Sequence, residues 1–284
     1  MSIFENSILC VDLGGTHCSA ALVEQEKECI ISGTYHRDHV HSDANKEQIF
    51  SEIESVIHQV IGARKETIQR VLISCPGPFD YQNGISLMDG MNKYQSLLHV
   101  NLKDFFAKIT GVSTHNIKFF NDAAAFLLGE VFYQKIKNKR VVGLTLGTGL
   151  GSALYEQGKI QDLNYGSATF KNGIAEDMIS TRGILAHLRS NFEDIDFDNI
   201  KAVVEDPSLV MHKKEAFDFL SKQLIDFLNQ YVVPLAPDSV IIGGSIAKAH
   251  LHFFERVCDA VPLNLQVASF DENNLFLGLT LETS

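Results

Sequence analysis

Several features that define common protein classes are missing from this 284-residue chain. No apolar run approaches the ~18 residues that a membrane-spanning helix needs, so we expect no membrane span. The N-terminus has no basic segment followed by a long apolar core, so we expect no signal peptide. Positive charge is scarce as well. The formal net charge of −11 argues against nucleic acid or an anionic membrane as the main partner.

Cysteine is present but follows no known pattern. The five cysteines are odd in number and scattered, and no Cys-x-x-Cys pair occurs. Zinc ribbons and dithiol redox motifs are therefore excluded by spacing. Free thiols in apolar runs act as small hydrophobic residues, and a reduced, cytoplasmic compartment fits this usage best.

Two nucleotide-binding signatures are also missing. The sequence contains no GxxxxGK[ST] loop, and no GxGxxG opens a strand–helix–strand unit. We therefore disfavour a Walker-type nucleotide hydrolase and a Rossmann dehydrogenase. An acidic protein can still bind a nucleotide, because backbone N–H groups, helix N-termini and a metal ion supply positive charge locally.

The composition that remains is that of an ordinary globular protein, with 45% hydrophobic and 21% charged residues. At one domain per ~150 residues, the length suggests two lobes. Hydrophobic periodicity predicts strands and helices in alternation. The predicted strands cover residues 8–13, 18–24, 29–35, 71–75, 117–120, 141–146, 151–155 and 239–242. The predicted helices cover residues 44–63, 102–110, 122–136, 175–190, 212–233, 245–257 and 273–281.

Both halves of the chain begin with a strand that runs into a glycine–threonine turn. The first reads DLGGTH from Asp12 to His17, and the second reads LTLGTGLGSAL with Gly147, Thr148 and Gly149 at its centre. Such turns present several N–H groups to one anion, and glycine lets phosphate oxygens approach. Either turn alone is more simply a plain hairpin, but one in each half is what clamping a polyphosphate requires. The repetition predicts duplicated α/β lobes facing each other across a cleft.

Asn121 and Asp122 stand between a predicted strand and a predicted helix. Both residue types are good helix N-caps, which is the simplest interpretation. Strand-to-helix junctions are also where α/β folds place ligands. A carboxylate there can accept the proton of a hydroxyl that attacks a γ-phosphate, and both roles are compatible.

At these residues the sequence resembles the ROK family of sugar kinases and their relatives. DLGGTH looks like the family's first phosphate motif. The segment SCPGPFDYQNG, followed by Asn92, looks like its Pro-Gly-Pro segment with the sugar-contacting Asn. NDAAAFLLGE looks like the segment that carries the catalytic Asp. LTLGTGLGSAL resembles the second phosphate motif, and VIIGGSIAKA the adenosine-side glycine pair. The motifs occur in the family's order over most of the chain.

The resemblance implies a two-lobed actin/hexokinase-like (ribonuclease H-like) α/β fold with a duplicated mixed-sheet unit and a central cleft. We place a smaller N-terminal lobe at residues 1–121 and a larger C-terminal lobe at 122–271, with a C-terminal helix at about 272–284 packing back on the first lobe.

The resemblance also implies roles for individual residues. Asp122 would be the general base, Asn92, Asn121 and Asp122 would bind the sugar, and Asp12 would act on Mg²⁺ through water. The nucleotide-binding candidates are Gly14, Gly15, Thr16, His17, Gly147, Thr148, Gly149, Gly243, Gly244 and Ser245. His17, His99 and His187 are interpreted as surface or hydrogen-bonded histidines without a catalytic role.

One region departs from the family pattern. Many members carry Gly-Glu-x-Gly-His followed by a cysteine-rich zinc loop, whereas this chain has only NYGSATFKNGIAEDMIS. We therefore expect no zinc, and the identity of the sugar stays open. That loop ends in Gly-Cys-x-Glu, which Gly173-Ile174-Ala175-Glu176 matches, so Glu176 is a candidate sugar ligand; the alternative is an ordinary acid in the first turn of a helix.

The expected activity is transfer of the γ-phosphoryl group of Mg-ATP to a hexose hydroxyl, at C6 of glucose or a related sugar. The alternatives are a catalytically weak sugar-binding sensor of the same fold, or another enzyme of the superfamily. A DNA-binding repressor is disfavoured, because DLGGTH starts at residue 12 and the charge is acidic. The family resemblance also suggests a homodimer.

Overall fold

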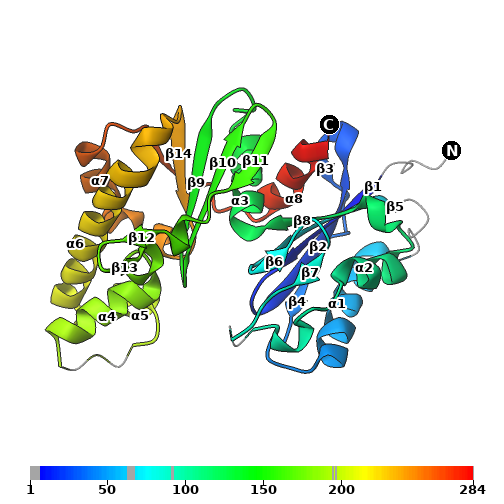
Figure 1. Ribbon diagram of the computed structural model, residues 1–284, viewed down its shortest axis with the longest axis horizontal. Coiled ribbons are helices and arrows are strands. Elements are labelled where there is room, and N and C mark those ends of the chain that lie inside the picture. Colours follow the sequence, from blue (N-terminus) through cyan, green and yellow to red (C-terminus); the bar gives the residue numbers. More distant parts are fainter. Residues whose placement is uncertain (1–6, 63–67, 91–92, 194, 196, 284) are drawn as a thin grey trace. The chain divides into compact units, whose positions relative to one another are not determined.

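The computed structural model describes residues 7–62, 68–90, 93–193, 195 and 197–283, in which the chain forms two compact units (Figure 1). The first unit runs to Tyr133 and resumes at Asp271, and the second is Gln134–Phe270. The first unit thus extends past residue 121, where the sequence suggested a boundary. The reason is that helix α3 (Asp122–Tyr133) packs against helix α8 (Asn273–Leu279).

The first unit is built on a six-stranded mixed sheet in the order β3-β2-β1-β5-β8, with β4 beside β2. β1 is antiparallel to β2 and parallel to β5, and β5 is parallel to β8. The strands are β1 Ser7–Leu13, β2 His17–Glu24, β3 Cys29–Ile30, β4 His36–His39, β5 Ile68–Cys75 and β8 Ile117–Asn121, and a separate small hairpin pairs β6 Phe79–Asp80 with β7 Ile85–Ser86.

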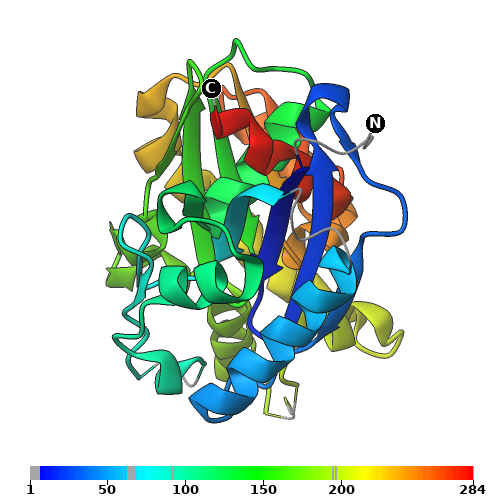
Figure 2. The same ribbon diagram turned by 90° about the vertical axis from the view of Figure 1, so that its right-hand side faces the viewer.

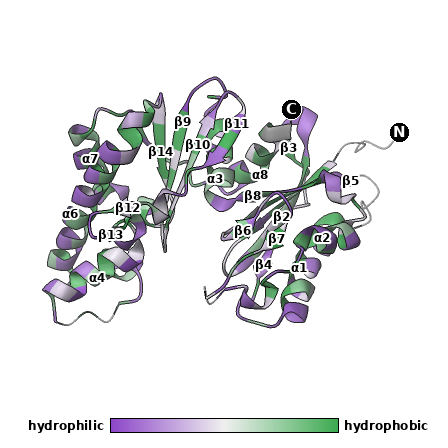
Figure 3. Cartoon of the chain, viewed as in Figure 1, coloured by the Kyte–Doolittle hydropathy of each residue, from purple (hydrophilic) through white to green (hydrophobic). Residues whose placement is uncertain are grey.

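Helices cover both faces of this sheet (Figures 1 and 2). Alternate strand side chains point to opposite faces, and Leu9 and Val11 of β1 share a core with residues of α1 (Lys46–Ile61) and α2 (Leu102–Thr110). On the other face α8 contacts β1 and β2 and packs on α3. In Figure 3 the hydrophobic colour is concentrated on the strands and on one side of the helices, which is the pattern of a two-sided core.

The second unit repeats the same plan. Its five-stranded sheet has the order β11-β10-β9-β14-β15, with β9 antiparallel to β10 and parallel to β14, as β1 is to β2 and β5. This repetition confirms the predicted duplication of a mixed-sheet unit. The strands are β9 Val141–Leu146, β10 Leu150–Glu156, β11 Lys159–Asp162, β14 Ser239–Gly243 and β15 Leu265–Val267, and a small hairpin pairs β12 Thr169–Phe170 with β13 Gly173–Ile174.

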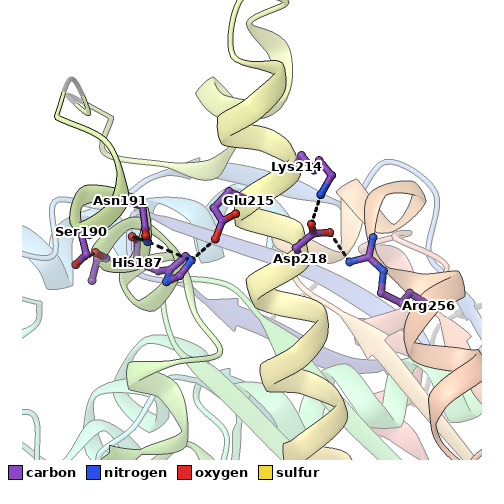
Figure 4. Close-up of polar contacts among 8 residues, drawn as sticks. His187, Ser190, Asn191, Lys214, Glu215, Asp218 and Arg256 are labelled. Atoms are coloured by element: carbon purple, nitrogen blue, oxygen red, sulfur yellow. Dashed lines mark hydrogen bonds and ion pairs between the residues drawn. The ribbon is translucent and has the colours of Figure 1, made fainter.

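Four α-helices belong to the described part of the second unit: α4 Thr181–Asn191, α5 Ile200–Glu205, α6 Val210–Phe227 and α7 Phe254–Ala260. Polar side chains connect α4, α6 and α7 (Figure 4). His187 Nε2 lies 2.8 Å from Glu215 Oε1, and its ring stacks on Phe219. Asp218 accepts hydrogen bonds from Lys214 and Arg256. His187 therefore has the partners of a structural histidine, as the sequence suggested.

The helix predicted over residues 175–190 is interrupted. Residues Ala175–Asp177 form a single 3₁₀ turn, and α4 starts only at Thr181. Ser180 is the reason, because its hydroxyl accepts a hydrogen bond from the N–H of Gly183 and so caps a new helix. Among the described residues, no helix combines the length and apolar character that crossing a membrane needs.

Candidate active site

The first glycine turn joins β1 to β2, and the protein holds all of its carbonyl groups. Gly14 O accepts from the Tyr94 hydroxyl at 2.6 Å, and Gly15 O accepts from Ser42 Oγ at 2.6 Å. Thr16 O accepts from the Val40 N–H at 2.9 Å. Tethered carbonyls fix the direction of the peptide planes, so the turn is preorganised.

The amide groups of the same turn are bonded differently. The N–H of Gly14 donates to the carbonyl of His17 at 2.9 Å, closing the turn on itself. Within the described residues, no backbone carbonyl accepts from the N–H groups of Gly15 and Thr16. The carbonyl groups of this turn are hydrogen-bonded, whereas the N–H groups of Gly15 and Thr16 have no backbone acceptor in the part of the chain that the structure describes. Such a turn is suited to binding an anion. The His17 ring contacts the Thr16 hydroxyl at 2.9 Å and packs edge-on against His39.

Asp12 lies near the end of β1, opposite Ser74 of β5. Asp12 is half-buried, and desolvation raises the pKa of its carboxyl to about 6. The Ser74 hydroxyl lowers the pKa of Asp12, while the charges of Asp122 and Glu272 raise it further. Asp12 and Asp122 therefore lie close enough to interact. A carboxylate oxygen next to an anion-binding turn is the kind of ligand that Mg²⁺ takes, directly or through water.

Asn121 ends β8 and Asp122 begins α3. Asn121 Oδ1 accepts from the Ala123 N–H at 2.9 Å, and its amide donates to the Tyr81 hydroxyl at 3.0 Å. Asn121 therefore acts as a helix cap, which is the simplest interpretation of its place between a strand and a helix. The Asp122 side chain is exposed, and the first turn of α3 favours its negative charge. Asn92, a further predicted sugar ligand, lies outside the residues that the structure describes.

The second glycine turn joins β9 to β10 in the second unit. Gly147 donates to the carbonyl of Gly149 at 3.0 Å, and its own carbonyl accepts from the Thr181 N–H at 2.8 Å, at the start of α4. Thr148 is exposed at the tip. This turn too has a carbonyl fixed by the surrounding protein.

The glycine pair after β14 lies directly against this second turn. Gly244 has φ +87°, and a Cβ there would lie 2.4 Å from the carbonyl oxygen of Leu146, so only glycine fits. A Cβ on Gly147 would be 3.5 Å from Ser245 Oγ. The structure thus brings together two motifs, around Gly147 and Gly244, that are far apart in the sequence.

Glu176 lies in the same unit, in the 3₁₀ turn before α4. A Cβ on Gly149 would lie 2.9 Å from Oε2 of Glu176, and a Cβ on Gly166 would lie 3.3 Å from the same atom. Its Oε1 is 3.4 Å from Arg182. The carboxylate therefore sits beside the second glycine turn, held by an arginine, where the absence of side chains leaves it room.

One residue that the motifs did not point to also lies at the first turn. The side chain of Lys93 crosses Gly15, and its Nζ lies 2.8 Å from where a Cβ of Gly15 would be. A lone lysine in a loop has no sequence signal for such a contact. Only the fold, by bringing residues 15 and 93 together, reveals it.

The residues of the first unit fit a magnesium nucleotide in chemical type: a carboxylate, a lysine and unpaired N–H groups around one turn. No group of three or more His, Cys, Asp or Glu side chains that could bind a metal by themselves occurs among the described residues. The expected absence of zinc stays a prediction.

A model of the ROK family matches residues 8–169 of the chain. No curated protein sequence matches this chain. Among solved structures, the ROK hexokinase from Thermus thermophilus has a TM-score of 0.72 at 17% identity, with 97% of each chain covered. A ROK family glucokinase from Streptomyces griseus, in complex with glucose and AMPPNP, has a TM-score of 0.68 at 19% identity, covering 96% of this chain and 98% of that one.

Regulators share the fold as well. A ROK family transcriptional regulator, a homologue of the E. coli MLC protein, has a TM-score of 0.71 at 17% identity, covering 98% of this chain and 78% of that one. These likenesses confirm the predicted actin/hexokinase-like α/β fold. With the family model matching more than half of its length, the chain belongs to the ROK family.

Proposed function

We propose that this protein transfers the γ-phosphoryl group of Mg-ATP to a hexose hydroxyl, at C6 of glucose or a related sugar, with Asp122 as general base. One observation carries the proposal. The anion-binding turn after β1 and the exposed carboxylate after β8 belong to one sheet, in which only β5 separates the two strands. Since β1, β5 and β8 are parallel, both lie at the same edge of the sheet, and an anion site and a base are the two elements that phosphoryl transfer to an alcohol requires.

The chemistry assigned to Asp122 is the removal of one proton. As the sugar oxygen forms its bond to the γ-phosphorus, the bond from that phosphorus to the β–γ bridging oxygen breaks, and ADP leaves with the bridging oxygen. The hydroxyl proton passes to the Asp122 carboxylate. The N–H groups of Gly15 and Thr16 would stabilise the charge of the phosphoryl oxygens, and Asp12 would hold Mg²⁺ through water.

The residues of the second unit are proposed to bind the rest of the substrates. The turn at Gly147 and Thr148 would contact phosphate oxygens, and the segment from Gly243 to Ser245 would lie at the adenosine. Glu176 is proposed to accept a hydrogen bond from a sugar hydroxyl. In support, Glu176 points toward the turn instead of outward, and Arg182 steadies it.

The test is ADP release from Mg-ATP across a panel of hexoses and N-acetylhexosamines, with wild type and Asp122→Asn. We expect one sugar class to stimulate ADP release. Losing the base should lower kcat by about 10²- to 10⁴-fold while sugar affinity changes far less. Asp104→Asn, an exposed acid on α2, is the matched control and should behave like wild type. Equal turnover in Asp122→Asn and wild type would refute the assignment of the base.

A second function is a sugar-binding regulator with little turnover, which is supported by the missing Gly-Glu-x-Gly-His segment and by the fold shared with a ROK family transcriptional regulator. The ligands of a sugar are also less complete than the motifs suggest. Asn121, a predicted sugar ligand, already uses its carbonyl oxygen on Ala123 and its amide on Tyr81. A sugar would have to share or replace those contacts. Sugar binding measured by calorimetry, without ADP release for any member of the panel, would identify this function instead.

A further inference from the structure

Lys93 lies flat across the first glycine turn. A Cβ built on Gly15 would lie 2.8 Å from the lysine Nζ and 3.2 Å from both Cδ and Cε. Real side chains do not approach that closely, so the lysine occupies the space that a side chain at position 15 would take. The second glycine of DLGGTH therefore makes room for a cation of this chain as well as for a ligand.

The position of Lys93 is fixed by its neighbour. Tyr94 is almost fully buried, its hydroxyl donates to Gly14 O at 2.6 Å, and its N–H donates to Ser42 O at 2.5 Å. Ser42 in turn donates to Gly15 O. Since the residue next to Lys93 is bonded to the glycine turn itself, the backbone of Lys93 is held beside the turn.

The charge of Lys93 is not used inside the described part of the protein. Its side chain is exposed, and no carboxylate among the described residues pairs with it. Some cations of the chain are paired, such as Arg37 with Glu272 and Lys171 with Asp226 at 2.7 Å. Among the residues that the structure describes, the ammonium group of Lys93 has no counter-ion and the adjacent N–H groups of Gly15 and Thr16 have no backbone acceptor, so donors are concentrated at one point.

We propose that Lys93 is a further phosphate-binding residue, whose ammonium group contacts the terminal phosphoryl group of the nucleotide at the first glycine turn. The inference rests on the kinase function proposed above. Because the base Asp122 belongs to the same unit as Lys93, the phosphoryl group that reaches this turn is the one being transferred. Its oxygens carry the negative charge in the transition state, which a lysine neutralises as a point charge.

The proposal is tested by binding of Mg-AMPPNP and Mg-ADP, measured by calorimetry on wild type, Lys93→Met and Lys93→Arg. Lys108→Met, which removes an exposed lysine from α2, is the control for net charge. We expect Lys93→Met to weaken Mg-AMPPNP about 10- to 100-fold, the effect of one charged hydrogen bond, and Mg-ADP less than about 2-fold. Lys93→Arg should keep most of the affinity, and Lys108→Met all of it.

The outcomes separate this inference from the function beneath it. If wild type binds neither nucleotide, the kinase proposal is wrong, and so is the proposed role of Lys93 in phosphate binding. If wild type binds both and Lys93→Met weakens both equally or neither, Lys93 is not a ligand of the terminal phosphoryl group, while the kinase proposal stands. A thermal unfolding curve unchanged from wild type shows that Lys93→Met is folded, as expected for an exposed side chain.

Discussion

Burial of Asp12 has opposite consequences for folding and for the proposed reaction. Desolvation raises the pKa of its carboxyl from 3.8 to about 6, so at neutral pH the folded protein holds a charge that the fold disfavours. A water-coordinated Mg²⁺ would compensate that charge. Such a residue costs stability in the free protein, and binding of a cation would offset that cost.

This cost predicts how an amide at position 12 behaves. Below pH 3.8 the carboxyl is protonated in both the folded and unfolded states, and above pH 6 it is ionised in both. Between pH 3.8 and about pH 6 the folded state binds the proton more tightly than the unfolded state, so the free energy of unfolding falls as pH rises. The rise in the pKa of Asp12 from 3.8 to about 6 corresponds to a loss of up to about 3 kcal/mol in the free energy of unfolding. In magnesium-free buffer, we expect Asp12→Asn to be more stable than wild type at pH 7.5 by up to that amount, and equal to it well below pH 3.8.

Urea denaturation followed by circular dichroism measures the effect. Asp80→Asn is a control of opposite sign, because hydrogen bonds from Asn83 lower the pKa of Asp80 and the amide should lose stability at pH 7.5. An Asp12→Asn protein that is less stable than wild type at both pH values would contradict the assigned cost.

The limits of sequence reasoning at the site are clearest for single residues. Gly14, Thr16 and Asp122 belong to local patterns, a strand followed by a turn or a cap, and could be singled out from the sequence. The contact between Lys93 and Gly15 could not, because it depends on a hydrogen bond from Tyr94 to Gly14 across 80 positions. Local patterns predict which backbone will turn, and only tertiary packing determines which side chain covers it.

At the scale of elements, patterns with clear ends were predicted well. Helix α1 begins after Asn45, whose side chain accepts from the Gln48 N–H, within two residues of the predicted start at residue 44. The predicted helix over 175–190 missed the cap at Ser180, because apolar spacing alone does not show a break of a few residues. Strand β4 at His36–His39 was also missed, since its exposed polar side chains lack an alternating pattern.

The crossing of α3 and α8 is the element-scale contact with the sharpest consequence. A Cβ on Gly278 would lie 2.2 Å from the Gly129 nitrogen and 2.3 Å from the Leu128 carbonyl carbon, so the two helices approach backbone to backbone. In an isolated helix, alanine would be better than glycine by about 1 kcal/mol. We expect the opposite sign here. Gly278→Ala should destabilise the first unit by about 1–3 kcal/mol or more, because the backbone of α3 cannot yield as a side chain can.

Thermal unfolding of purified protein measures this prediction. Asn273→Ala, an exposed position on the same helix, is the control and should change stability by less than about 0.5 kcal/mol. Gly278→Ala with unchanged or raised stability would show that α8 does not pack on α3 as described.

At the scale of the whole molecule, the chain organises two separate cores. One core gathers residues of β1, β5, α1 and α2, and the other gathers residues of β9, β14, α4 and α6. The first unit needs two pieces of chain, because α8 returns to it, whereas the second is the single segment Gln134–Phe270. From the sequence we expect a C-terminal helix on the first lobe and a lobe boundary at residue 121, and the first compact unit runs to Tyr133.

Continuity of the second segment predicts that it folds by itself. A chain of residues 134–270 contains its whole five-stranded sheet and the helices of its own core, so it should give a cooperative thermal transition and near-native helix content. Residues 1–133 alone lack Phe276 and Leu279 of α8, both buried, and should unfold without a cooperative transition. Joining 271–284 to residue 133 through a flexible linker should restore that transition. If residues 134–270 instead lacked a cooperative transition while the full chain unfolded in one step, the two units would have to be regarded as a single folding unit, since neither core would then suffice without the other.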